Sequence, residues 1–405
     1  MSQDERGMLA SEMEEELLND ILPFWPRFID QENGGFYGQV ENDRRPDPRA
    51  DKGLVMHARL LWTYSAAARL LGRPGLLSTA DTAYRFLVDS LYDKDQKGFS
   101  FACDFQGHRR PGLKIVYGQA FAVYALAEYA RAGGPGRALD LATETFRLLQ
   151  RTAYDQRDGG YSEAAAPDWS KSAVSALGDG DIACAKSMNT NLHVLEAFTA
   201  LHAATDDAAV GHALRRQIEI HLDKIVTPTA HLSLYFDNDW SRLDAVMSYG
   251  HDVEASWLLT EAAERVKDAQ LETRVRRCSL QMAAAIARVL DENQGSLPNE
   301  LKDGRLDTDR IWWVQAEGIV GMVNAAELSG DAGYLRRASM LWKFVKAFLI
   351  DHVHGEWFWG VNHPGNAPLP ERYKGGAWKA SYHNGRACMQ VMSRLAHGGE
   401  GGAER

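Results

Sequence analysis

A short motif recurs along the chain at intervals of about 60 residues. Each copy combines an apolar residue, an aspartate, a polar turn, a glycine and usually an aromatic residue. The copies are IDQENGGFYG from Ile29, YDKDQKGFSF from Tyr92, YDQRDGGYSEA from Tyr154, IDHVHGEWFWG from Ile350 and a degenerate LDENQGSLPNE from Leu290. The aspartates of neighbouring copies stand 63, 62 and 60 residues apart, and one copy is missing from the 136-residue gap between Asp155 and Asp291. A period of this length, with room for two helices, predicts an array of helical hairpins.

Apolar residues between these motifs recur with helical spacing. In LVMHARLLWTYSAAARLLG and AFAVYALAEYARAG, alanine and leucine repeat at this spacing and glycine ends the run. Convincing strand patterns are few. The spacing predicts about twelve helices, near residues 8–22, 54–71, 75–92, 117–132, 136–152, 190–204, 208–224, 251–265, 270–291, 310–329, 332–350 and 382–396.

Six hairpins account for the chain, with one extra loop near residues 162–188. An open array of this length would leave the apolar faces of its two ends exposed, so we expect the array to close into a ring. The predicted fold is all-α: an (α/α)6 barrel, a toroid of six helical hairpins that forms one domain over residues 1–397. One helix of each hairpin would lie inside the ring and the other outside. A disordered C-terminal tail is expected at 398–405.

Every second predicted helix carries a polar side chain in its early, otherwise apolar part. These side chains follow one another at steps of 58, 76, 61, 63 and 66 residues. Burying an unpaired polar or charged group is costly, so six such residues at repeat-related positions favour one shared polar site over six accidents. The sequence therefore predicts that these helices form the inner ring, with their first turns converging at one end. The six residues are Arg59, Tyr117, His193, Glu254, Glu317 and His383.

The stretch YGHDVEASWLL, residues 249–259, illustrates the pattern. His251, Glu254 and Trp257 are spaced three apart and so share one face of a helix. Taken alone, a histidine and a glutamate at this spacing are an ordinary surface pair. Their place in the repeat favours a role in the shared site instead.

Composition excludes several classes of function. The formal net charge of −10 argues against nucleic acid or an anionic membrane surface as a partner. No apolar run approaches the roughly 20 residues needed to span a bilayer, and the acidic amphipathic start is unlike a secretory signal. Four scattered cysteines without metal-binding spacing favour the reducing cytoplasm. The 11 tryptophans and 14 tyrosines suit either a large core or stacking against sugar faces.

At these residues the chain resembles the N-acylglucosamine 2-epimerase superfamily, and within it the cellobiose 2-epimerases. The resemblance runs over nearly the whole chain, and no departure from the epimerase pattern is visible at the quoted positions. It implies an (α/α)6 barrel and a metal-independent isomerase without a cofactor. The stretches that carry it are ADKGLVMHARLLW, KSMNTNLHVLEAF, SYGHDVEASWLL, RIWWVQAEG and SYHNGRACM.

The resemblance also implies roles for matching residues. His251 and His383 would be the two acid/base groups, while His193 and Arg59 would hold oxygen atoms of the opened sugar. Trp313 and Trp378 would be stacking platforms for the sugar. The expected hydrogen-bonding and wall residues are Tyr117, Asp181, Asn189, Glu254, Trp257 and Glu317.

A 2-epimerase needs these residue types. It removes the C2 proton of a ring-opened sugar and returns a proton to the opposite face, so two histidines from different hairpins suit the two steps. Arg59 would stabilise the enediolate, and Glu254 would orient His251 from one turn away. Alternatives remain at this stage. Arg59 could pair with Glu254 or Glu317, the histidines and tryptophans could be core residues, and His193, His251, His383 and Glu254 could ligate a metal.

The predicted function is 2-epimerisation of the reducing-end glucose of β-1,4-linked disaccharides, with cellobiose giving glucosyl-mannose. A monosaccharide 2-epimerase or an aldose–ketose isomerase of the same superfamily is the first alternative, because both share the enediolate. A glycoside hydrolase would need two carboxylates about 5–10 Å apart, and a non-catalytic sugar-binding protein would need only the aromatic residues. The expected partner is an oligosaccharide or monosaccharide substrate, and the expected state is a monomer or weak homodimer.

Overall fold

The computed structural model describes residues 3–171, 175–178, 181–370 and 372–396. This part of the chain is mostly helical, as the spacing of apolar residues predicted. The tail predicted at 398–405 lies outside the described residues. Within the described ranges, no helix combines the length and the apolarity that crossing a membrane requires.

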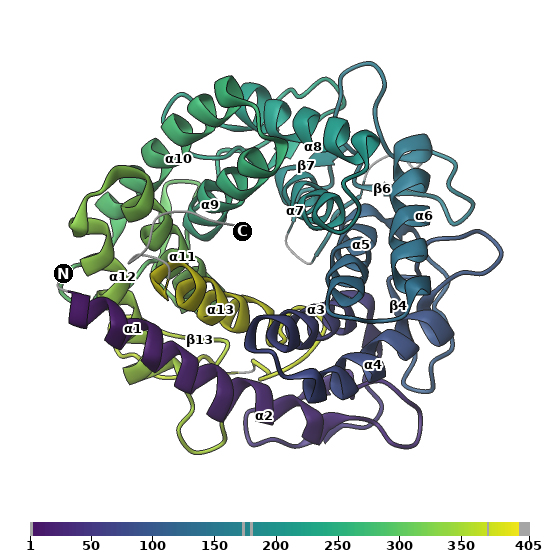
Figure 1. Ribbon diagram of the computed structural model, residues 1–405, viewed down its shortest axis with the longest axis horizontal. Coiled ribbons are helices and arrows are strands. Elements are labelled where there is room, and N and C mark those ends of the chain that lie inside the picture. The colour runs from purple at the N-terminus through teal and green to yellow at the C-terminus, as the bar shows by residue number, and fades with distance from the viewer. Residues whose placement is uncertain (1–2, 172–174, 179–180, 371, 397–405) are drawn as a thin grey trace.

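Six helices of the described chain surround the centre of the molecule as an inner ring (Figure 1). Each packs against the next one along the chain, and the last packs against the first, so the ring is closed. Most of their residues are buried, as expected for helices that pack against neighbours on both sides. The inner helices are α3 (Leu54–Leu71), α5 (Val116–Arg131), α7 (Met188–Thr205), α9 (Tyr249–Val266), α11 (Trp312–Ser329) and α13 (Tyr382–Ala396).

A second layer of helices surrounds this ring (Figure 1). These outer helices bury one apolar face and leave the other to solvent, as α6 shows with its buried residues at helical spacing. The outer helices are α1 (Gln3–Glu16), α4 (Leu77–Phe86), α6 (Gly136–Thr152), α8 (Ala208–Ile220), α10 (Ala269–Val289) and α12 (Ala332–Phe344). Wider turns extend four of them: η1 (Leu17–Ile21), η4 (Leu87–Leu91), η5 (His221–Ile225) and η6 (Val345–Leu349). The remaining short pieces are α2 (Leu22–Phe24), η2 (Trp25–Phe28) and η3 (Pro74–Leu76).

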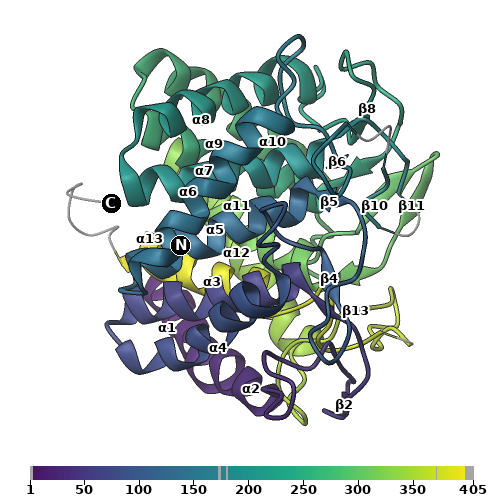
Figure 2. The same cartoon turned by 90° about the vertical axis from the view of Figure 1, so that its right-hand side faces the viewer.

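Short strands, which the sequence did not predict, gather on one side of the ring (Figure 2). The strand before each of five inner helices, α3 to α11, pairs antiparallel with a strand of the following hairpin. A bridge between Val40 and Gly375 joins the first hairpin to the last. The strands are β1 (Gln39–Val40), β2 (Pro46–Asp47), β3 (Lys52–Gly53), β4 (Ala102–Cys103), β5 (Lys114–Ile115), β6 (Ala164–Ala165), β7 (Lys186–Ser187), β8 (Tyr235–Phe236), β9 (Met247–Ser248), β10 (Glu300–Lys302), β11 (Arg305–Asp307), β12 (Arg310–Ile311) and β13 (Gly360–Val361).

The recurring aspartates fasten the connection between each outer helix and the next inner helix at this same end. The Asp30 carboxylate accepts hydrogen bonds from the backbone N–H groups of Glu32 and Asn33, which closes the turn, and it also accepts one from the Lys52 ammonium at 2.7 Å. Both side chains of this ion pair are buried. The equivalent pairs are Asp93–Lys114, Asp155–Lys186, Asp291–Arg310 and Asp351–Lys374.

The missing copy of the motif lies at residues 226–232, where Val226 and Leu232 form the equivalent bridge. Thr227 stands where the other copies have aspartate. This turn keeps the contact from the inner helix that other copies also have: the Asp252 carboxylate accepts a hydrogen bond from the Leu232 N–H at 2.7 Å, as the Gln119 amide does from Phe99 at 2.8 Å. Asp252 also contacts the His231 ring at 2.6 Å.

Replacing Asp155 by asparagine tests this fastening. Lys186 is buried and would lose its carboxylate partner at 2.7 Å, so we expect the free energy of unfolding in urea to fall by about 1–2 kcal/mol. Arg157→Gln, which removes an exposed ion pair with Asp158, is the matched control and should change little. Equal stability of Asp155→Asn and the parent protein would contradict the fastening role.

Candidate active site

Contacts join all six of the repeat-related polar residues into one network at the strand end of the inner ring. The Arg59 guanidinium donates to the Tyr117 hydroxyl at 3.0 Å, and the Tyr117 ring lies 4.9 Å from the ring of His193. From His193 the network continues through Glu196 and the Arg386 guanidinium. Arg386 then reaches Glu254 and Glu317, and Glu317 bonds His383.

The three histidines of the network share one arrangement. In each, Nδ1 makes a hydrogen bond with a neighbouring side chain, which fixes the orientation of the ring. Among the described residues, Nε2 of each has no hydrogen-bond partner and is left for a ligand. The three Nδ1 contacts are His193 with Glu196 at 2.8 Å, His251 with the Ser248 hydroxyl at 2.8 Å and His383 with Glu317 at 2.7 Å.

The indole of Trp313 contacts the two histidines predicted to act as acid and base. Its ring centroid lies 4.7 Å from that of His251 and 5.6 Å from that of His383. His251 belongs to α9 and His383 to α13, with Trp313 on α11 between them. Two oriented imidazoles from different hairpins therefore meet around one partly exposed aromatic face.

Gly250 makes the close approach of Trp313 possible. A Cβ atom at this position would lie 2.5 Å from two indole carbons of Trp313, which is too close for any real contact. We expect Gly250→Ala to displace the indole and lower kcat/KM for the sugar substrate by about 10- to 100-fold, since small misplacements of positioning groups have effects of this size. Steady-state kinetics would measure this. Gly136→Ala, with nothing within 4 Å of its added Cβ, is the control, and equal activity of the two variants would contradict the prediction.

Arg386 is the centre of the network and is only 1% exposed. Its guanidinium bonds the carboxylates of Glu196, Glu254 and Glu317. It also lies over the rings of Trp257 and Tyr382, at 4.7 and 4.3 Å from their centroids. Three buried carboxylates are thus held together by one cation.

This arrangement corrects one sequence expectation and rules out one alternative. The Glu254 carboxylate bonds Arg386, and the partner of the His251 ring is Ser248, so the expected pairing of Glu254 with His251 does not occur. The pairing of a histidine with the glutamate three residues later is found at His193 and Glu196 instead. Arg59 was also considered as a partner of Glu254 or Glu317, but it bonds Tyr117 and the backbone carbonyl of Trp378.

The electrostatic environment favours the neutral form of the two acid/base candidates, His251 and His383. Burial and the neighbouring His193 lower the pKa of His251, and burial together with Arg59 and Arg386 lowers the pKa of His383 well below its usual value. Burial and the charge of Glu317 raise the pKa of Glu254 to about 7. Neutral imidazoles with free Nε2 atoms are suited to accept a proton.

Arg59 and Trp378 form a second part of the site, beside Tyr117. The Trp378 ring lies 5.9 Å from the Tyr117 ring and 6.0 Å from the Phe101 ring. The Arg59 Nε atom is buried and has no partner among the described residues. Asn189 likewise has a buried, unpartnered Oδ1. Unpaired polar atoms beside an aromatic ring are suited to bind a hydroxylated ligand.

Three other predicted site residues are buried within or behind the network, and a fourth lies outside it. Trp257 is 1% exposed, and its Nε1 donates to Glu317 at 3.0 Å, so it supports the network from behind and does not face a ligand. Glu254 and Glu317 are also fully buried. Asp181 lies in an exposed loop, where it accepts hydrogen bonds from the Tyr235 hydroxyl and the Gly178 N–H, and no described contact joins it to the histidines.

The donor atoms do not fit a metal ion. Ligand atoms of Glu254, Glu317 and His383 lie within 4.8 Å of one another, which is close enough for shared ligation. However, one nitrogen of the Arg386 guanidinium bonds both carboxylates and supplies the positive charge there. A divalent cation at the same place would be repelled by the positive charge of this guanidinium.

Sequence reasoning missed four members of the network: Glu196, Ser248, Tyr382 and Arg386. The HVLE spacing of His193 and Glu196 matches the HDVE spacing of His251 and Glu254, so a signal for Glu196 was present. Arg386 follows His383 by three residues on α13 and was visible only as a charge within an apolar stripe. The Tyr382 hydroxyl bonds Glu196 and Arg386, and no pattern indicated this contact.

These features define a helical ring protein with a cluster of oriented histidines and buried carboxylates at one end of the ring. The N-acylglucosamine 2-epimerase (GlcNAc 2-epimerase) family model matches residues 35–387, a span that contains the whole network, and the chain belongs to this family. It is 41% identical to the cellobiose 2-epimerase of Bacteroides fragilis, with 95% of this chain and 99% of the relative covered.

Two further comparisons extend this result. The solved structure of the cellobiose 2-epimerase from Spirochaeta thermophila matches with a TM-score of 0.89 and 43% identity, covering 97% of this chain and 98% of that chain. A D-mannose isomerase of Thermobifida fusca is 25% identical, with 82% of each chain covered.

Proposed function

We propose that this protein is a cellobiose 2-epimerase with an (α/α)6 barrel fold, which interconverts glucose and mannose at the reducing end of β-1,4-linked disaccharides. The observation that carries the proposal is the pair of imidazoles, His251 and His383, which are oriented through Nδ1 and both contact the indole of Trp313. The identity to cellobiose 2-epimerases over nearly the full chain supports it.

The chemistry requires two proton transfers at one carbon. Once the sugar ring is open, the C2 proton is acidic because the C1 aldehyde accepts the charge as an enediolate. One neutral histidine takes this proton through Nε2. The enediolate charge raises the pKa of the other histidine, which takes up a proton from solvent and returns it to the opposite face of C2, while the first histidine gives its proton back to solvent. The overall reaction consumes no proton. The Glu317 carboxylate against Nδ1 of His383 would stabilise the imidazolium on that residue.

The remaining residues would bind the substrate. Arg59 offers an unpartnered buried N–H, which suits the oxygens where enediolate charge develops. Trp378 lies beside Tyr117 and would stack on the sugar, and His193 would hold an oxygen through its free Nε2. Four cysteines, none of them in a disulfide, support a reducing compartment, and we propose the cytoplasm.

Two alternatives are less well supported. An aldose–ketose isomerase would use the same enediolate and return the proton to C1, but the matched D-mannose isomerase is far less similar than the epimerases. A glycoside hydrolase would need two available carboxylates. Glu254 and Glu317 are fully buried and bonded to Arg386, so neither is free to serve as a nucleophile or acid.

Incubation with cellobiose in D2O tests the function directly. We expect glucosyl-mannose with deuterium at C2, because the returned proton comes from a histidine that exchanges with solvent. Mass spectrometry and NMR of the product would measure the label and its position. A ketose at the reducing end would indicate an isomerase, free glucose a hydrolase, and unlabelled cellobiose with measurable affinity a binding protein.

A further inference from the structure

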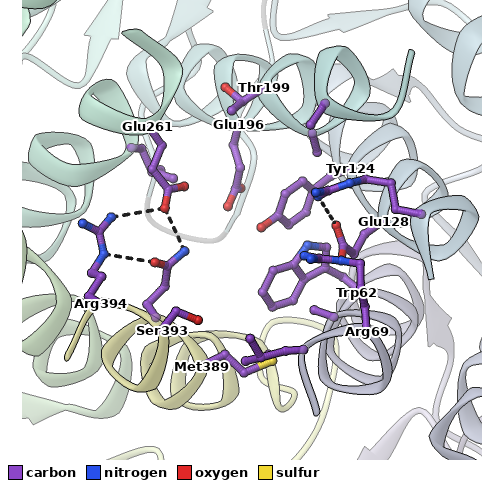
Figure 3. A pocket seen from close by; sticks show the side chains of 17 residues that line it. Trp62, Arg69, Tyr124, Glu128, Glu196, Thr199, Glu261, Met389, Ser393 and Arg394 are labelled. Atoms are coloured by element: carbon purple, nitrogen blue, oxygen red, sulfur yellow. Dashed lines mark hydrogen bonds and ion pairs between the residues drawn. The ribbon is translucent and has the colours of Figure 1, made fainter. Parts of the chain in front are cut away.

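A cavity of about 370 Å³ lies at the opposite end of the ring from the strands. Residues from the second halves of α3, α5, α7, α9 and α13 line it, and Figure 3 shows their side chains around the open centre. We call it the rear cavity. Its volume falls within the usual range of small-molecule sites. Glu196 is the one member of the histidine network that also lines this cavity.

Two polar groups on the wall of the rear cavity have no partner among the described residues. Trp62 and Tyr124 are 7% and 8% exposed, and their rings stack at 5.2 Å with an interplanar angle of 13°. Neither the indole N–H of Trp62 nor the hydroxyl of Tyr124 makes a hydrogen bond in the described chain, and Figure 3 shows the Tyr124 hydroxyl pointing into the cavity. Neither atom is among the fully buried unpartnered atoms of the described chain, so both remain open to the cavity. These two groups therefore offer hydrogen bonds to a ligand that carries hydroxyl groups.

The charges around the rear cavity balance one another. Glu128 is bound by Arg69 at 2.7 Å and Arg131 at 2.8 Å, and Glu261 is bound by Arg394 at 3.2 Å. The carboxylate of Glu196 is taken up by Arg386 and His193. The lining thus leaves no unpaired carboxylate to attract a cation. The lining holds three guanidinium groups and three carboxylates, and each carboxylate has a cationic partner, which favours a neutral ligand over an ion.

We propose that the rear cavity binds a neutral polyhydroxylated molecule of hexose size, separately from the histidine site. An apolar ligand would leave the Trp62 and Tyr124 groups unpaired, which costs binding energy, whereas sugar hydroxyls can both accept and donate there. Small and apolar side chains such as Ala66, Ala200 and Met389 fill the rest of the wall. The inference goes beyond the proposed function and does not depend on it.

Calorimetric titration with methyl β-D-glucopyranoside tests the proposal, because this glycoside cannot open its ring and is not epimerised. We expect binding that Tyr124→Phe weakens about fivefold, the typical effect of losing one hydrogen bond. Ala203→Phe, which fills the cavity from α7, should abolish this binding. Trp378→Ala, at the other end of the ring, should leave it unchanged. Activity on cellobiose should persist in Tyr124→Phe and Ala203→Phe, which shows that both variants fold.

The outcomes separate the possibilities. Binding that is lost in Trp378→Ala and retained in both cavity variants would mean that the glycoside binds only at the histidine site, and would overturn the proposal. No binding to the parent protein would mean that the cavity holds only water, and would overturn it as well. Ala209→Phe, at an exposed alanine of α8, controls for the added ring. Neither overturning result would affect the epimerase assignment, which the deuterium label tests on its own.

Discussion

Replacing His383 by alanine is expected to lower kcat on cellobiose by about 10²- to 10⁴-fold, the usual contribution of a general acid or base. His251→Ala should lower kcat by a factor of the same order. Each histidine is fixed through Nδ1 and contacts Trp313, so either substitution removes one of the two groups that would exchange a proton with C2. Stopped-time assays of product formation, combined with C2–deuterium exchange in D2O, would measure the loss.

The exchange experiment makes the test sharper. If one histidine serves each face of C2, a single variant should still exchange the C2 proton of one epimer slowly while interconversion fails. Circular dichroism should show an unchanged helical content. His212→Ala, at an exposed histidine of α8, is the control and should keep full activity. Activity of either site variant within a few-fold of the parent would remove that histidine from the acid/base pair.

The ring itself was predictable because its signal is local. Each hairpin repeats one motif and two helices with an apolar face. The aspartate of the motif accepts hydrogen bonds from backbone N–H groups two and three residues further along the chain, as Asp30 does. The paired strands were not predictable, because two residues cannot show an alternating pattern and their partners lie one hairpin further along the chain. The motif copy at 226–232 was not recognisable because its segment, VTPTAHL, contains neither the aspartate nor the glycine of the motif.

The site was predictable in part. The repeat located Arg59, His193 and His383, because a costly polar residue recurring on an inner helix is visible in sequence. The repeat did not show which of these side chains hydrogen-bond to one another, because that depends on the direction in which each side chain points across the ring. His193 and His251 each precede a glutamate by three residues, yet only His193 bonds it. Other early polar residues of the inner helices, such as Gln119 and Asn191, bond backbone N–H groups of the motif turns and are structural.

Arg386→Met is the variant with the largest expected effect on stability. It removes the cation that bonds Glu196, Glu254 and Glu317 while keeping most of the side-chain volume. Breaking a buried ion network by removing one partner leaves uncompensated charge, so we expect the free energy of unfolding to fall by about 3–5 kcal/mol at pH 8. Urea unfolding followed by circular dichroism would measure this. Activity should also fall, because Glu317 orients His383 and Glu196 orients His193.

The pH dependence distinguishes uncompensated charge from lost packing. The pKa of Glu254 is raised to about 7 even with Arg386 present, by burial and by Glu317. A carboxyl whose folded pKa lies above its unfolded value of about 4.3 stabilises the protein below that value and loses this contribution as pH rises through the folded pKa. The loss of unfolding free energy in Arg386→Met relative to the parent should therefore be smaller at pH 5 than at pH 8.

A double variant tests the same point. Adding Glu254→Gln to Arg386→Met should restore part of the stability at pH 8, because one of the three charges is gone. A deficit that is constant with pH, and a double variant no more stable than the single one, would show that Arg386 acts through packing alone.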